Sequence, residues 1–142
     1  MLLTITTIAR RVLQATGMAQ VALGLLFWTN RALGLLPLHM RIGAIFVLSL
    51  WALAGLAARS GVRWNLPLLA LVVGLIIPVF GIVHMWILPG SAHWIVRTVH
   101  LLLGAAGMVL AARLDREIRA RAEARGTGPA AESAPSPTQR AA

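Results

Sequence analysis

Histidine is the residue type in this chain best suited to chemistry, and it occurs four times, at His39, His84, His93 and His100. The chain has no Cys, Lys or Tyr, and residues 1–114 contain no carboxylate. This excludes a thiolate nucleophile, a lysine Schiff base, a Ser-His-Asp triad and a carboxylate pair from that region. Imidazole is therefore the only side chain there, besides arginine, that titrates, and it also binds metals. We expect no independent hydrolase or phosphotransferase.

Two of the histidines are each followed four residues later by a glycine, and an arginine stands two or three residues from each. A glycine one helical turn from a histidine leaves room for a flat ligand against the backbone. Imidazoles from two helices are suitable axial ligands for haem b, and arginines suit its propionates. The candidate residues are His39, Gly43, Arg41, His100, Gly104 and Arg97, with His84 and His93 as alternative axial ligands.

Counting along the predicted helices gives the two imidazoles different depths. His39 lies 20 residues from Arg59, and His100 lies 13 residues from Arg113. At 1.5 Å per residue, this count predicts that His100 is about 10 Å deeper in the membrane than His39. The count does not favour these two histidines as a ligand pair.

A second hypothesis places copper or zinc at the outer rim of the bundle. Two His-Met dipeptides, His39-Met40 and His84-Met85, are predicted at one level with His93. Imidazole and thioether suit copper, and three imidazoles suit zinc. Adjacent helical residues point about 100° apart, so neither dipeptide is expected to chelate through both side chains.

The elements that carry these residues are apolar helices. Of the 142 residues, 58% are hydrophobic and only 12% are charged, and the mean hydropathy is +0.80. A soluble domain has about twice that share of charged residues. The net charge of +9 is explained by arginines that are expected at the cytoplasmic ends of membrane spans, and a nucleic-acid-binding surface is not needed to explain it.

The order of apolar and polar segments predicts an all-α, up-and-down bundle of four transmembrane helices. An interfacial lead precedes the spans, a cytoplasmic helical extension follows them, and a Gly/Pro/Ala/Ser-rich tail is expected to be disordered. The predicted boundaries are 1–11 for the lead, 12–28, 38–58, 66–88 and 92–114 for the spans, 115–125 for the extension and 126–142 for the tail.

Arginine predicts the orientation of the bundle. The start of the chain, the middle connector and the end of the last span are rich in arginine, whereas the turn at residues 89–91 has none. The positive-inside rule therefore predicts that both termini are cytoplasmic. In the last span, a stripe of polar and then small residues is expected to face the bundle. It consists of His93, Arg97, His100, Gly104, Gly107 and Ala111.

Three segments resemble a group of small four-helix bacterial membrane proteins that have no assigned activity. They are Leu36-Pro-Leu-His-Met-Arg-Ile-Gly43, Pro89-Gly-Ser-Ala-His-Trp94 and Val99-His-Leu-Leu-Leu-Gly104. The resemblance covers about residues 12–114 and implies a multi-pass protein of the bacterial inner membrane. The pattern of helix-borne histidine with glycine one turn away is also similar to membrane subunits of b-type cytochromes, which implies haem and electron transfer.

Three functions remain open at this stage. The first is a small haem protein that transfers electrons near the outer leaflet, as a subunit of a redox complex or with quinone, which Gln20 could contact. The second is a cofactor-free accessory subunit in a homo- or hetero-oligomer. The third is the copper or zinc site. All three predict the lipid bilayer as a partner.

Overall fold

The protein is all-helical in the part of the chain that the computed structural model describes, residues 1–83 and 86–126. No strand occurs in these residues, so the predicted all-α class is confirmed. The helices are α1 (Leu2–Trp28), the short 3₁₀ helix η1 (Leu33–Leu35), α2 (Leu36–Arg59), α3 (Asn65–Val83) and α4 (His93–Gly126).

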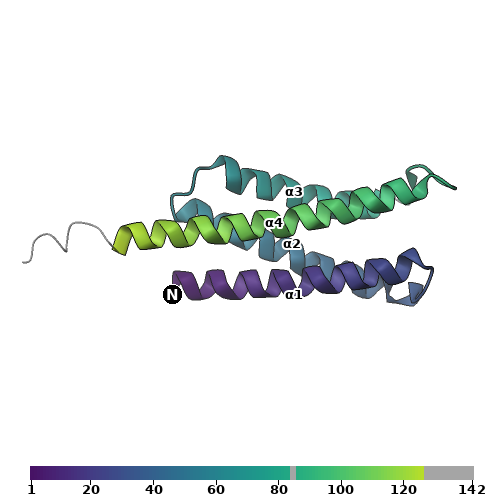
Figure 1. The fold of residues 1–142 in the computed structure, drawn as a ribbon, viewed down its shortest axis with the longest axis horizontal. Helices are drawn as coiled ribbons and strands as arrows, with labels where there is room; N and C mark the ends of the chain where they lie inside the picture. Colours follow the sequence, from purple (N-terminus) through teal and green to yellow (C-terminus); the bar gives the residue numbers. More distant parts are fainter. Residues whose placement is uncertain (84–85, 127–142) are drawn as a thin grey trace, which may run out of the picture.

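The four long helices pack side by side, and successive helices run in alternating directions (Figure 1). Helices α2 and α4 each contact the other three, and α1 and α3 lie on opposite sides of this central pair. The N-terminus and the C-terminal end of α4 lie at one end of the bundle (Figure 1), which we call the terminal end. The end that holds Trp28 and His93 is the opposite end.

Several helix boundaries lie within two residues of the predicted span boundaries, such as the end of α1 and the start of α4. Helix α3 begins at Asn65, whose side-chain oxygen accepts a hydrogen bond from the Leu66 amide at 3.0 Å, and Pro67 follows in the first turn. The predicted end of this span at residue 88 is wrong, because residues 86–92 form turns and Leu88 has a positive φ of 48°. The predicted lead, residues 1–11, forms the first turns of α1.

Three of the helical segments are long and apolar enough to cross a membrane: Leu33–Arg59, Asn65–Val83 and His93–Gly126. Helix α1 is not among them, because two arginines and two glutamines interrupt its apolar sequence. Large apolar side chains such as Leu48 and Leu75 point outward and are 60% and 56% exposed. Such apolar surfaces are compatible with contact with a lipid bilayer and suggest a membrane protein.

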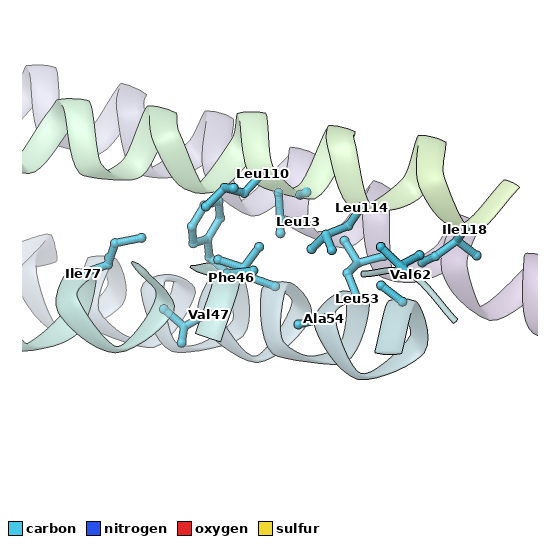
Figure 2. Close-up of a cluster of buried hydrophobic side chains, with 14 residues drawn as sticks. Leu13, Phe46, Val47, Leu53, Ala54, Val62, Ile77, Leu110, Leu114 and Ile118 are labelled. Atoms are coloured by element: carbon cyan, nitrogen blue, oxygen red, sulfur yellow. The ribbon is translucent and has the colours of Figure 1, made fainter. Parts of the chain in front are cut away.

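The hydrophobic core occupies the terminal half of the bundle. The cluster extends from Phe46 and Ile77 to Val62 and Ile118 (Figure 2). Every member on α2 and α4 lies at least seven residues beyond His39 or ten beyond His100 toward the terminal end. In the half of the bundle that holds these histidines, Val96 is the buried aliphatic side chain among the described residues, and it is not part of this cluster.

Helix α4 corrects one prediction about its C-terminal part. Residues 115–125 were expected to continue the last helix into water, and they do continue it, but Asp115 and Ile118 are fully buried. They pack beside the N-terminal turns of α1, where Thr6 is also fully buried. The predicted disordered tail, apart from Gly126 at the end of α4, lies outside the described residues.

Candidate functional site

The structure brings His39 and His100 together. His39 lies in the first turns of α2 and His100 in the second turn of α4, and both side chains are half-buried. Their ring centroids are 6.4 Å apart, with the ring planes tilted by 47°. The two histidines that the His-Gly spacing selected are therefore neighbours.

The depth offset predicted between these histidines is wrong, because Arg113 does not mark the inner level of α4. Arg125, three turns further on, donates a hydrogen bond to the Ser60 carbonyl at the end of α2. Measured from this contact, His39 is 21 residues away and His100 is 25 residues away. The long Arg125 side chain accounts for most of the remaining difference of about 6 Å.

All four helices contribute to the surroundings of the histidine pair. Phe27 of α1 meets His39 edge-on, with ring centroids 5.4 Å apart. Phe80 of α3 stacks on His100 at 6.1 Å, with planes 13° apart. A Cβ at Gly81 would lie 3.2 Å from the His100 ring, so the α3 backbone closely approaches this imidazole. The rings are thus held between aromatic side chains and helix backbone.

The two glycines expected to leave room for a flat ligand have different surroundings. No atom lies within 4 Å of the position that a Cβ at Gly104 would occupy. A Cβ at Gly43, in contrast, would lie 2.5 Å from the Gln20 side-chain nitrogen, so the Gln20 amide fills this space. The Gln20 side-chain oxygen is buried and has no hydrogen-bond partner among the described residues.

The two candidate arginines also differ. Arg97 lies one turn from His100 on α4 and is half-buried, and its guanidinium donates to the Trp28 carbonyl at 3.4 Å. Arg41 is exposed and lies two positions after His39, so its side chain points about 200° away from that of His39 around α2. Only Arg97 therefore lies on the same helical face as a histidine of the pair.

The other proposed ligands form no recognised metal-binding group in the part of the chain that the structure describes. His93 lies at the start of α4, and its Nδ1 is 3.3 Å from the Ile87 carbonyl oxygen. Met40 is 58% exposed. His84 and Met85 lie outside the described residues. Within those residues, no group of three His, Asp or Glu side chains is arranged to hold a metal ion.

The spacing of the imidazole pair fits six-coordinate haem iron. An imidazole nitrogen binds a transition metal at about 2.0–2.1 Å and lies about 1.1 Å from its ring centroid, so two axial imidazoles have centroids about 6.3 Å apart. The observed separation of 6.4 Å matches this value. The open space at Gly104 suits a macrocycle edge, whereas on the Gly43 side the Gln20 amide must move to admit one.

Sequence reasoning missed a buried ionic network at the terminal end. Asp115 is fully buried and forms ion pairs with Arg10 of α1 and with Arg119, at 3.1 Å, on its own helix. Arg119 also donates to the Thr7 hydroxyl at 2.9 Å. The network joins residues more than 100 positions apart and fixes the axial position of α1 against α4.

A signal for this network was present in the sequence. The inward stripe of α4 continues at helical spacing from Ala111 to Asp115 and Ile118, which predicts burial of all three. Because charge usually marks the solvated part of a helix, Asp115 was assigned to water instead.

Comparison of the chain with models of protein families, with curated proteins and with solved structures finds no match.

Proposed function

We propose that this protein is a small membrane haem protein that transfers electrons, with His39 and His100 as the axial ligands of haem b. The observation that carries this proposal is the 6.4 Å separation of the two imidazole centroids. Haem held by two imidazoles supplies a one-electron carrier with no open coordination position. Residues 1–114 contain no carboxylate that could act as a general acid or base, which also favours electron transfer over hydrolysis.

The side chains around the pair have defined tasks in this proposal. Phe27 and Phe80 restrict the rotation of the imidazoles and exclude water from them. Arg97 provides a positive charge near His100 that suits a propionate. The cluster of buried aliphatic side chains lies in the terminal half, so few buried aliphatic side chains surround the histidine pair.

The proposal includes a fourth membrane span and a cytoplasmic location for both termini. Helix α1 has 27 residues, about 40 Å, and packs along α2 and α4, so it is long enough to cross with them. Nine arginines of the described residues lie toward the terminal end, and three, Arg31, Arg41 and Arg97, lie toward the opposite end. The positive-inside rule then favours a cytoplasmic terminal end in a bacterial inner membrane. Haem would lie in the outer half.

A partner must supply and accept the electrons. The exposed apolar surfaces suit lateral contact with a membrane redox protein or with quinone in the bilayer. Electron transfer requires that the partner comes close to the haem edge. It does not require a substrate pocket in this chain.

The visible absorption spectrum of the detergent-purified protein tests the proposal. The protein is produced in a haem-sufficient host and measured as isolated and after dithionite reduction. We expect a Soret band that sharpens on reduction, with split α and β bands. His39→Ala and His100→Ala should each abolish the six-coordinate spectrum, whereas His93→Ala should retain it.

Circular dichroism and thermal unfolding show whether each variant is folded. A flat spectrum from folded wild-type protein that has been exposed to haem would refute the proposal. If the protein then co-purified with a partner, the hypothesis of a cofactor-free accessory subunit would replace the haem proposal. Stoichiometric copper or zinc without a Soret band would instead support the hypothesis of a copper or zinc site at the rim.

A further inference from the structure

The terminal end of α1 carries a shallow groove of mixed character. Its lining residues all belong to α1 and are Leu3, Thr4, Thr7, Ile8 and Arg11. The side chain of a helical residue points back toward the N-terminus of its helix. The Arg11 guanidinium therefore lies over the turn that holds Thr7 and Thr4, and brings a positive charge to two hydroxyl groups.

The ionic network beside this groove has more positive than negative charge. One carboxylate, Asp115, is paired with two guanidiniums, those of Arg10 and Arg119. Arg119 reaches the groove directly, because its Nη2 donates to the Thr7 hydroxyl at 2.9 Å. Of the other acids on the described part of α4, Glu123 interacts with Arg119 and Glu117 is exposed. Arg11 is exposed and forms no ion pair within the described residues.

In the membrane orientation proposed above, the groove lies at the level of the headgroups of the cytoplasmic leaflet. Thr7 lies 21 residues from Trp28. This is about 31 Å of helix, close to the hydrocarbon thickness of a bilayer. Ile8 in the groove and Val12, one turn further along α1, are 57% and 38% exposed, so they offer apolar contact to an acyl chain.

We propose that this groove binds the phosphate of an anionic phospholipid, with Arg11 and the hydroxyl of Thr4 as its principal donors and Arg119 as an additional cation. The acyl chains of the lipid contact Ile8 and Val12. The apolar residues next to the cation favour a lipid over free phosphate, which would gain nothing from them. The lipid links α1 to α4 at the same level as Asp115. This inference is independent of haem.

Titration of the detergent-solubilised protein with short-chain phosphatidylglycerol tests the proposal, with tryptophan fluorescence or calorimetry as the readout. Short-chain phosphatidylcholine and inorganic phosphate are titrated in parallel. We expect phosphatidylglycerol to bind most tightly, and Arg11→Gln to weaken its binding about fivefold, the effect of one arginine at a membrane surface. Arg31→Gln, at the opposite end of the bundle, is the matched control and should change the affinity less than twofold.

Thr4→Val is a second variant that removes a donor while keeping the side-chain size, and it should also weaken phosphatidylglycerol binding. Both substituted residues are exposed, so the fold should tolerate these changes. Equal affinities for the two lipids would overturn the proposal, as would an unchanged affinity of Arg11→Gln. Inorganic phosphate that binds as tightly as phosphatidylglycerol and competes with it would show a site for free phosphate instead.

Discussion

Removing the two arginines that compensate Asp115 should destabilise the protein strongly, and removing the Asp115 charge as well should restore part of the loss. The perturbation is the variant Arg10→Ala/Arg119→Ala, compared with the same variant carrying Asp115→Asn. In the wild type, both arginines form ion pairs with the fully buried carboxylate.

The different exposures of these side chains give the expected magnitudes. The Asp115 side chain is 1% exposed, whereas those of Arg10 and Arg119 are 36% and 39% exposed. A buried charge that loses its partners costs about 3–5 kcal/mol of unfolding free energy. We expect this loss for the double arginine variant. The half-exposed arginines can regain water, so Asp115→Asn alone should cost only about 1–2 kcal/mol.

Reversible unfolding in mixed detergent micelles, followed by far-ultraviolet circular dichroism, measures these free energies. Arg116→Ala is the control, because Arg116 is the exposed neighbour of Asp115 and lies outside the network. It should leave the unfolding free energy within about 0.5 kcal/mol of the wild type. The triple variant should be more stable than the double arginine variant by at least about 1 kcal/mol.

A triple variant that is no more stable than the double variant would refute this reasoning. The stability lost in the double variant would then come from the packing of the arginine side chains, and Asp115 would not be a buried charge that needs compensation. A double variant as stable as the wild type would show that α1 is not held against α4 by this network.

Three glycine variants test the packing of the core and the Trp51 contact. Gly107→Ala should destabilise the protein by about 1–3 kcal/mol in the same unfolding assay, because the new methyl group would lie 3.0 Å from the Phe46 ring. Gly55→Ala, where the methyl group meets no atom within 4 Å, should be neutral or should stabilise α2 by up to about 1 kcal/mol, and a loss there would contradict the described packing. Gly74→Ala should displace the Trp51 indole from its hydrogen bond to an α3 carbonyl, cost about 1 kcal/mol and shift the tryptophan emission, with no shift in a Trp51→Phe background.

The start of helix α3 illustrates what local sequence determines. An asparagine followed two residues later by proline is a strong start signal, and the helix begins at Asn65. The end of the same helix was placed five residues too far along, because apolar residues continue to Leu88 and hydropathy does not detect the turn there. Helix α1 shows the opposite case, since Arg10 and Arg11 were read as a boundary and lie inside one helix.

The candidate site also has some features that the sequence predicts and others that depend on how the helices pack. The His-Gly spacing selected His39 and His100 from four histidines, and this needed only the sequence. The filling of the Gly43 space by Gln20 could not be predicted, because it depends on how α1 is rotated against α2. The burial of Asp115 depends on an axial match between two helices at opposite ends of the chain.

The sequence by itself therefore determined the helical class, the apolar character and the absence of acids around the histidines, because composition and hydrophobic period are local properties. Only the tertiary structure decided that His39 and His100 lie side by side, with centroids 6.4 Å apart. The physical reason is that helices can slide along one another until side chains interlock and charges are paired. In this bundle, the contacts of Asp115 and Arg125 at the terminal end set that sliding position, and thereby the level of the histidines about 20–40 Å away.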